Sequence, residues 1–363
     1  MPVPAIRPDQ RKRWQDPFVY AGVVAGSATL RSLGPRISGR ALGEFGELFG
    51  RAPFNRARID RSVRNIQWCF PECGDAKART IAHASYRHLF MLGAETSMSP
   101  RHFAFDQWPD WITFGDLGRA VSLMLSGPAI LITGHCGNWE LLGAWLGGLG
   151  LPMHAVYRPF DNLAIDGWVR RTRARLGIDL VDKFGASDII PQVLEENEPV
   201  AFIADQNAGD RGLFVPFFDR LASTYKSIGL LAMRHEAPII CGAALRTTRH
   251  ADELNIEGLR YHIDVYDIIT PDDWADQPDP LFYITARYRR AMEAMIRAAP
   301  EQYLWMQKAW RSRPRFERDG KPMPASLVRK LESLPWMDES QMSRIQESSG
   351  ASAPASKTPV AAI

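Results

Sequence analysis

The chain has 363 residues, of which 45% are hydrophobic, and it carries a formal net charge of +3. It is too long for one minimal domain, and its composition supports a sizeable core, so one large α/β domain with an N-terminal extension fits. The four cysteines contain no CxxC pair, which argues against a zinc site and favours free thiols in a reducing compartment.

The positive charge is concentrated at the N-terminus. Residues 1–64 contain twelve Arg or Lys residues and five Asp or Glu residues, a net charge of +7, which leaves −4 for the rest of the chain. A basic segment of this kind suits an anionic membrane surface or an acidic protein partner, or it is a solvated Arg-rich leader. We expect no nucleic-acid partner.

In chain order, we expect an irregular basic leader over residues 1–17 and a helical, membrane-associating region over residues 18–100. Residues 18–30, FVYAGVVAGSATL, are apolar but only thirteen residues long, whereas a membrane-spanning helix needs roughly 20. No cleavable signal is evident. The run therefore predicts a helix that lies in the membrane interface, with basic and aromatic flanks at headgroup level, or a helix of the core.

Residues 76–96 and 114–125 continue the helical pattern, and an α/β pattern then follows within a domain that we expect to span residues 101–316. Short apolar runs predict strands at 127–133, 153–158, 178–182, 199–205 and 238–247. Helical patterns alternate with them at 140–150, 162–177, 187–197 and 225–236. This alternation predicts an αβα layered domain with a mainly parallel central sheet.

The remaining segments are predicted as follows. Residues 206–224 are expected to form a long loop, and the alternating residues 261–269 an exposed or edge strand. Helices are predicted at 280–298 and 301–311. Residues 317–363 form a C-terminal extension, which we expect to be disordered from about residue 337 because it is small and polar.

The stretch GHCGNWELLG places His135 and Glu140 between a predicted strand and a predicted helix, with Gly137 and Asn138 in the turn between them. A neutral imidazole accepts a proton near neutral pH, and a nearby carboxylate stabilises the imidazolium. The N–H groups of the turn and helix start would bind an oxyanion. Alternatively, Asn138 caps the helix, Glu140 favours its N-terminus, and His135 is an ordinary turn residue.

Two more polar residues, Arg158 and Asp205, also directly follow predicted strands, where functional residues of α/β sheets gather. The chain has no GxSxG, GxxxxGK[ST] or HExxH motif, so it lacks the signatures of serine hydrolases, phosphate-loop enzymes and zinc peptidases. We expect neither a metal nor a cofactor. Without a nucleophilic side chain, His135 would act by deprotonating a hydroxyl that attacks a thioester directly.

GHCGNWE resembles the H-x4-D/E motif of the glycerolipid and lipid A acyltransferase superfamily, and its glutamate version resembles the lipid A biosynthesis (lauroyl/myristoyl) acyltransferase family. Other blocks are similar to that family in the same order: RSVRNIQWCFPE (61–72), VYRP (156–159), ADQNAGDRGLFVPFFDRLASTYKSIGLLAMRHEAPII (204–240) and EQYLWMQKAWRSRP (301–314). The chain departs from the family pattern at Asp219 and at Met306, Gln307 and Lys308.

The resemblance implies that His135 is the general base and Glu140 its partner. It implies that Arg158 binds phosphate or polarises the carbonyl, that Asp205 orients groups in the pocket, and that Gln206 and Thr224 are polar residues of the substrate site. Each of these four also has a structural alternative, as a surface ion pair, a loop anchor or a packing residue. Trp305 and Trp310 are expected in the core or at a membrane interface.

The implied activity is that of an O-acyltransferase that moves a fatty acyl chain from acyl-carrier protein, or from acyl-CoA, to a hydroxyl of a lipid A precursor or related glycolipid. The implied location is the cytoplasmic face of the inner membrane, with peripheral or shallow attachment. An acidic carrier protein would be attracted by the basic N-terminus and by the Arg-rich residues 170–175. The alternatives are a non-catalytic lipid-binding homologue and a hydrolase of lipid esters or thioesters.

Overall fold

The computed structural model describes residues 14–102, 111–247 and 260–350. Its N-terminal region is helical, as predicted, and contains α1 (Asp16–Arg51), the 3-10 turn η1 (Pro53–Asn55), α2 (Arg56–Cys69) and α3 (Asp75–His102). Helix α1 begins at Asp16, so the predicted irregular leader ends earlier than expected, and its residues 1–13 lie outside the described residues. None of the described helices is both long enough and apolar enough to cross a membrane.

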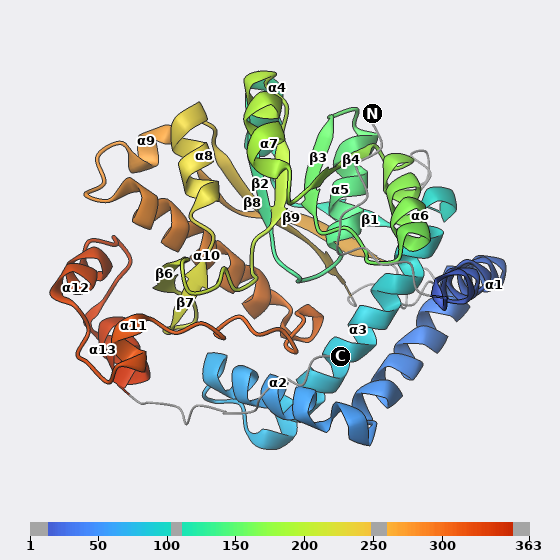
Figure 1. Ribbon diagram of the computed structural model, residues 1–363, viewed down its shortest axis with the longest axis horizontal. Helices are drawn as coiled ribbons and strands as arrows, with labels where there is room; N and C mark the ends of the chain where they lie inside the picture. The colour runs from blue at the N-terminus through green and yellow to red at the C-terminus, as the bar shows by residue number, and fades with distance from the viewer. Residues whose placement is uncertain (1–13, 103–110, 248–259, 351–363) are drawn as a thin grey trace.

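Helix α1 has two segments that meet at Gly34, whose φ of 78° is not helical. The second segment, residues 35–51, runs beside α3 (Figure 1). Three of its glycines, Gly43, Gly46 and Gly50, face α3, and a Cβ added at Gly46 would lie 2.7 Å from the carbonyl oxygen of Tyr86. Glycine therefore lets the two helices approach closely, which fixes the face that α1 turns toward the protein.

Replacing Gly46 by alanine is expected to lower the free energy of unfolding by ~1–3 kcal/mol, because the backbone of α3 must shift to admit a methyl group. Gly22→Ala in the same helix is the matched control, since nothing lies within 4 Å of its added Cβ. That control should be stabilised by ~0.5–1 kcal/mol through helix propensity. Urea unfolding of the full chain measures both values, and equal effects would refute the close packing.

The central sheet has seven strands in the order β1-β9-β8-β2-β5-β3-β4. All neighbouring pairs are parallel except β8 with β9, which confirms the mainly parallel sheet. The strands are β1 (Ile112–Phe114), β2 (Ile130–Thr133), β3 (Met153–Tyr157), β4 (Ile178–Asp182), β5 (Val200–Ile203), β8 (Ile239–Arg246) and β9 (Tyr261–Ile269). The helices around it are α4 (Gly118–Ser126), α5 (Trp139–Gly148), α6 (Leu163–Ala174), α7 (Ala186–Glu195), α8 (Ser227–His235), α9 (Pro271–Trp274) and α10 (Pro280–Ala298).

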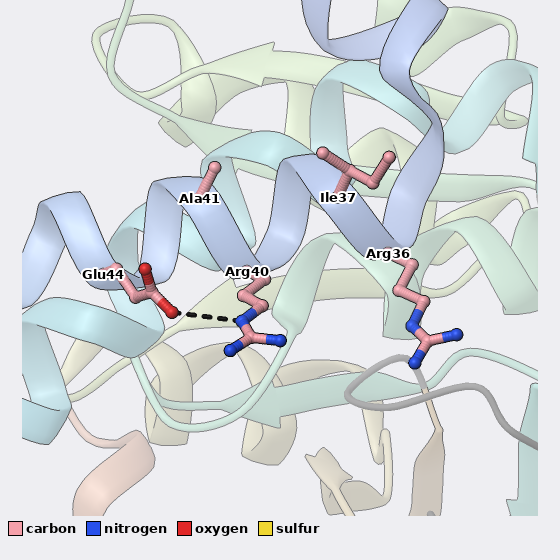
Figure 2. Close-up of a pocket in the computed structure, with 5 residues that line it drawn as sticks. All are labelled: Arg36, Ile37, Arg40, Ala41 and Glu44. Carbon is pink, nitrogen blue, oxygen red and sulfur yellow. Dashed lines mark hydrogen bonds and ion pairs between the residues drawn. The ribbon is translucent and has the colours of Figure 1, made fainter.

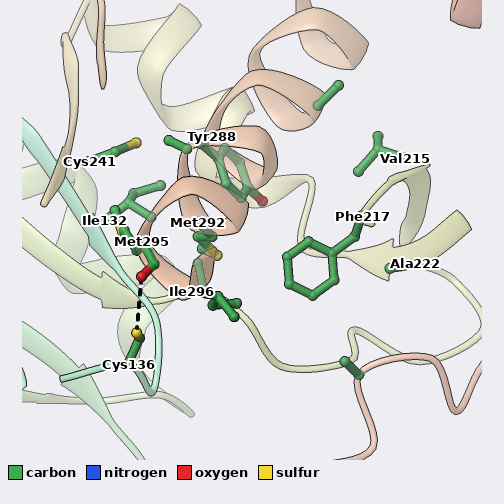
Figure 3. Packing of buried hydrophobic residues seen from close by; sticks show 14 of the residues in the cluster. Ile132, Cys136, Val215, Phe217, Ala222, Cys241, Tyr288, Met292, Met295 and Ile296 are labelled. Carbon is green, nitrogen blue, oxygen red and sulfur yellow. Dashed lines mark hydrogen bonds between the residues drawn. The ribbon is translucent and has the colours of Figure 1, made fainter. Parts of the chain in front are cut away.

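Successive strand residues point to opposite sides of the sheet, and each side packs against helices in its own core cluster. In β2, Ile130 and Ile132 join the core cluster beneath α7, α8 and α10, whereas Leu131 joins the cluster beneath α4 and α5. Figure 3 shows Ile132 and Cys136 packed against Met295 and neighbouring side chains of α10. A strand such as β2 is therefore a continuous apolar run, and the predicted αβα layering is confirmed.

Four predicted elements differ from the structure. The predicted loop 206–224 contains a hairpin of β6 (Leu213–Pro216) and β7 (Leu221–Thr224). The strand at 261–269, predicted as an exposed or edge strand, lies inside the sheet between β1 and β8. The edge position belongs to the short strand β1, which the sequence did not predict. The predicted helix 301–311 is irregular after η3 (Pro300–Gln302), and the predicted helix 114–125 begins later, as α4.

The C-terminal extension is ordered well beyond residue 337, contrary to the prediction. It forms α11 (Arg315–Arg318), α12 (Ala325–Glu332) and α13 (Glu339–Gly350), while residues 351–363 lie outside the described residues. Helix α13 packs on the turn between β6 and β7, where Arg344 pairs with Asp219 at 2.7 Å and Ile345 is fully buried. The prediction of disorder was based on the many small polar residues of this segment and did not account for the contacts of Arg344 and Ile345.

Candidate active site

The site lies at the carboxyl edge of the sheet, where β2, β5 and β3 end side by side. Strand β2 pairs in parallel with β5, and β5 pairs in parallel with β3, so the residues that follow them gather at one edge. His135 follows β2, Asp205 follows β5 and Arg158 follows β3. Three residues predicted from separate apolar runs therefore gather at one edge of the sheet.

His135 and Asp205 form the central pair of the site. The Nδ1 atom of His135 donates a hydrogen bond to Oδ1 of Asp205 at 2.7 Å, and the backbone N–H of His135 donates to Oδ2 at 3.1 Å. Gln307 adds a third donor to Asp205, from Nε2 at 3.3 Å. Since Nδ1 carries the proton, Nε2 of a neutral His135 is the nitrogen left to accept one.

Charge and burial shift the pKa values of this pair in opposite directions, and the effect of charge is the larger one at both residues. Burial acts to lower the pKa of His135, but the negative charge and hydrogen bond of Asp205 outweigh it, so the pKa is raised. Burial acts to raise the pKa of the fully buried Asp205, but His135 and the nearby Arg289 outweigh it, so that pKa is lowered. Asp205 therefore stays ionised and stabilises an imidazolium.

The turn after His135 uses Gly137 and Asn138 for shape. Gly137 has a φ of 64°, and a Cβ there would lie 2.2 Å from the carbonyl oxygen of Ala244. The side chain of Asn138 caps α5 by accepting from the N–H of Leu141 at 2.9 Å. Only glycine therefore fits the turn, and the predicted helix cap is present.

The same two residues do not supply the oxyanion donors that the sequence suggested. The N–H of Gly137 donates to the carbonyl of Gln302 at 3.1 Å, and the N–H of Asn138 donates to the carbonyl of Ala244 at 2.7 Å. Both donors are directed into the protein rather than toward His135. This corrects the prediction for Gly137 and Asn138, which contribute the turn.

A buried polar network that the sequence did not indicate holds the turn in place. Glu95 of α3 accepts hydrogen bonds from Asn138 at 2.9 Å and from the hydroxyl of Tyr261, and it forms an ion pair with Arg246 of β8. His88 of α3 donates through Nε2 to the carbonyl of Gly137 at 3.0 Å. Burial lowers the pKa of His88 to about 3, so this histidine is neutral and serves as a donor.

Glu140 lies in the first turn of α5 but does not hydrogen-bond to His135. Its two carboxylate oxygens accept from Arg173 of α6, with Nε at 2.8 Å from Oε2 and Nη2 on Oε1. Glu140 adds to the raised pKa of His135 only through its charge. The hydrogen-bonded carboxylate partner of His135 in this geometry is Asp205. Arg173, part of the Arg-rich stretch at 170–175, pairs with Glu140, which the sequence did not indicate.

The other predicted substrate residues fall into two groups. Arg158 and Gln206 are exposed at the strand ends and form no hydrogen bond or ion pair with the described residues. Thr224 is fully buried, so it has no surface to offer a substrate, which corrects that prediction. Its hydroxyl accepts from Nε of the buried Arg289 at 3.1 Å, and Arg289 also donates to the carbonyl of Ala204 at 3.3 Å.

Thr224 therefore contacts Arg289, whose positive charge helps to lower the pKa of Asp205. Trp305 and Trp310 are also buried, in agreement with a core role. The thiol of Cys136 is buried against the carbonyl of Met295 at 3.6 Å (Figure 3). Burial raises the pKa of this thiol, so Cys136 is no thiolate nucleophile.

No group of His, Cys, Asp and Glu side chains in the described part of the chain has a metal-binding arrangement.

A histidine that is hydrogen-bonded to a buried carboxylate at the carboxyl edge of a parallel sheet has the geometry that general-base chemistry requires. The chain matches the family model of bacterial lipid A biosynthesis acyltransferases over residues 9–312, so it belongs to that family and is an acyltransferase.

Its relatives within the family carry related names. It is 28% identical over 272 residues, 72% of this chain and 81% of the other, to a lipid A biosynthesis palmitoleoyltransferase of Escherichia coli (strain K12). It is 27% identical over 277 residues, 74% of this chain and 83% of the other, to a lipid A biosynthesis lauroyltransferase of the same strain. A lipid A biosynthesis acyltransferase of Haemophilus influenzae is 27% identical over 273 residues, again 74% of this chain and 83% of the other.

Proposed function

We propose that this acyltransferase moves a fatty acyl chain from a thioester donor, acyl-carrier protein or acyl-CoA, to a hydroxyl of a lipid A precursor or related glycolipid. The pair of His135 and Asp205 carries the proposal, because it provides a base with no nucleophilic side chain beside it. The names of the relatives support the choice of acceptor.

In the proposed reaction, Nε2 of His135 removes the proton from the acceptor hydroxyl as its oxygen attacks the thioester carbonyl. The new C–O bond forms, the C–S bond breaks, and the imidazolium returns the proton to the departing thiolate. Asp205 stabilises the imidazolium between these two steps. No acyl-enzyme intermediate is required.

Arg158 is the exposed cation that follows β3 at the same sheet edge. We assign it to a substrate phosphate or to the carbonyl oxygen on which negative charge develops, since the turn N–H groups are already engaged. Gln206, exposed after β5, is assigned to a polar group of the acceptor.

Glu140 and Arg173 are proposed to position the site as a unit. Replacing Glu140 by glutamine should lower the turnover rate by about 10–100-fold, because the bidentate pair with Arg173 is lost and the negative charge that supports His135 disappears. Steady-state assays of Glu140→Gln, Arg173→Ala and the double variant measure the coupling of the two residues. Independent, additive losses, or a rate equal to that of the wild type, would contradict this role.

The function is tested by comparing lipid extracts from cells with and without the protein by mass spectrometry. A lipid A species heavier by one fatty acyl group is expected only with the protein, and fragmentation locates the hydroxyl. The mass difference also gives the length of the acyl chain. The comparisons do not decide this length, because two relatives named for different acyl chains are almost equally similar to this protein.

Two rival functions predict different results with purified protein. A non-catalytic lipid-binding homologue gives no product with any thioester. A hydrolase releases free fatty acid when donor is supplied without acceptor, whereas the proposed transferase releases little. Either rival result would replace the proposed function.

We further propose that the protein works at the cytoplasmic face of the inner membrane as a peripheral protein. The basic N-terminal region supports this location because it suits the anionic lipid surface at which a glycolipid acceptor is found.

A further inference from the structure

Helix α2 carries arginines that no carboxylate neutralises. Its 14 residues include four arginines and a single acidic residue, Asp60. Asp60 forms an ion pair with Arg79 of α3 at 3.4 Å. Arg58, Arg61 and Arg64 form no ion pair with any residue that the structure describes. These three guanidinium groups therefore leave a local excess of positive charge.

An arginine of α1 shows the opposite arrangement. Arg40 pairs with Glu44 at 3.1 Å in the hollow on α1 that Figure 2 shows. On α2, by contrast, the groups that shift the pKa of Arg61 include no carboxylate. Burial lowers this pKa most, and the positive charges of Arg58 and Arg64 lower it further. A negative ligand would relieve the repulsion among these arginines.

A buried hydroxyl without a partner lies beside the same arginines. Tyr86 of α3 is 3% exposed, and its hydroxyl has no hydrogen-bond partner in the described part of the chain. The charges of Arg58 and Arg61 act on this hydroxyl, although burial is the larger effect and raises its pKa. A Cβ at Gly50 of α1 would lie 3.1 Å from the ring of Tyr86, so the ring is closely packed. A buried hydroxyl is costly to leave without a partner, so this one indicates a place for a ligand oxygen.

A short segment joins these arginines to the catalytic pair. Nη1 of Arg61 donates to the carbonyl of Met306 at 3.2 Å. The side chain of the next residue, Gln307, donates to Asp205 at 3.3 Å. Arg61 and Asp205 therefore contact adjacent residues of one segment, so a ligand of the arginines lies near the site of the reaction.

We propose that Arg58, Arg61 and the hydroxyl of Tyr86 bind a phosphate monoester of the glycolipid acceptor. Arg64 adds positive charge beside them. A phosphate has three strong acceptor oxygens, which match two guanidinium groups and one hydroxyl donor. The inference rests on the proposed function in naming the acceptor as the source of the phosphate.

A small anion fits this place better than the acidic surface of a carrier protein. Tyr86 is buried and Arg61 is half-buried, so the carboxylates of a folded partner would reach only the exposed arginines. The hydroxyl of Tyr86 is itself covered. The phosphate therefore enters as the exposed side chain of Arg58 turns away from Asn55, to which it donates at 2.9 Å.

The first test compares the Tm of the full chain in inorganic phosphate and in sodium chloride of equal ionic strength. Phosphate should raise the Tm of the wild type by ~1–2 °C relative to chloride, because it binds the folded chain. Tyr86→Phe and Arg61→Gln should lose this difference. In chloride, Tyr86→Phe should be at least as stable as the wild type, because it removes a buried hydroxyl that has no partner in the described chain. A structural role for this hydroxyl predicts a lower Tm in both salts.

The second test measures acyl transfer in neutral detergent, with the acceptor before and after removal of its phosphate by a phosphatase. Arg61→Gln should raise the KM for the phosphorylated acceptor about tenfold, and Tyr86→Phe about 3–5-fold. The kcat and the KM for the donor should change little, because the lost contacts lie away from the reacting atoms. With the dephosphorylated acceptor, both variants should match the wild type.

Arg56→Gln is the matched control, because it removes an exposed charge from the same helix, and Arg56 is not among the charges that act on Tyr86. It should behave like the wild type in both tests. The proposal is overturned by an equal loss in this control, by a wild type that phosphate does not stabilise, or by variants that keep the phosphate effect. A change in the KM for the donor, or a fall in kcat without a change in KM, would also overturn it.

The two tests separate this inference from the proposed function. The Tm comparison uses neither donor nor acceptor. A wild-type chain that is stabilised by phosphate through Tyr86 and Arg61, but transfers no acyl group, would refute the proposed function and the assignment to its acceptor. The same result would leave the phosphate site itself established.

Discussion

Replacing His135 by alanine is expected to reduce the rate of acyl transfer by ~10²–10⁴-fold, the usual contribution of a positioned general base. In the wild type, Asp205 fixes the proton on Nδ1 and leaves Nε2 to accept the proton of the acceptor hydroxyl. Alanine removes this acceptor but keeps the backbone N–H that donates to Asp205 at 3.1 Å. Turnover assays with a thioester donor and a lipid A precursor, followed by mass spectrometry, measure the effect.

The neighbouring residue provides the matched control for this prediction. Cys136→Ala removes a thiol that is buried against Met295 of α10, so it should keep turnover within severalfold of the wild type while lowering stability slightly. Thermal unfolding of both variants checks that the chain is intact. Turnover like the wild type in His135→Ala, or a complete loss in Cys136→Ala, would assign the chemistry to other residues.

Most of the sheet could be predicted because parallel strands buried on both faces are short, continuous apolar runs. Strand β2, with all four residues buried, is an example. Residues 301–311 are predicted as a helix but are irregular after η3, for a related reason. Tyr303, Leu304 and Trp305 are all buried, so their pattern does not distinguish a helix from the irregular segment that hydrogen-bonds to the carbonyl of His135 through Leu304.

Within the site, the positions of His135 and Asp205 at strand ends could be predicted, but their pairing could not. The two residues are seventy positions apart, and they meet because β2 and β5 are neighbours, which local patterns do not determine. The nearby Glu140 was the natural choice of partner by sequence distance, but its carboxylate is held by Arg173. The same argument applies to Glu95 and Arg246, whose hydrogen bonds and ion pair join separate elements.

Replacing Asp205 by asparagine is expected to lower the rate by about 10³–10⁴-fold, as the corresponding change does in serine-protease triads. An asparagine amide can donate to Nδ1 of His135, which favours the tautomer with its proton on Nε2 and removes the acceptor. The volume of the side chain is preserved, and Arg289 keeps its bonds to Thr224 and Ala204, so the chain should stay folded.

The pH dependence separates this role from simple packing. In the wild type the pKa of His135 is raised above its usual 6.5, so activity should fall as pH decreases through that raised value. Without the charge of Asp205, burial lowers the pKa, and the residual activity of Asp205→Asn should persist to lower pH. The measurement is kcat/KM across the acid range for both proteins.

A second histidine–carboxylate pair provides the control. His154 and Glu198 are 2.5 Å apart at the opposite end of β3, away from the carboxyl edge. Glu198→Gln disrupts a similar contact, so it should leave both the rate and its pH profile unchanged. If Asp205→Asn keeps the wild-type profile, Asp205 is only structural. If it is the partner of His135, the double variant His135→Ala with Asp205→Asn should be no slower than His135→Ala alone, because the two residues act as one unit.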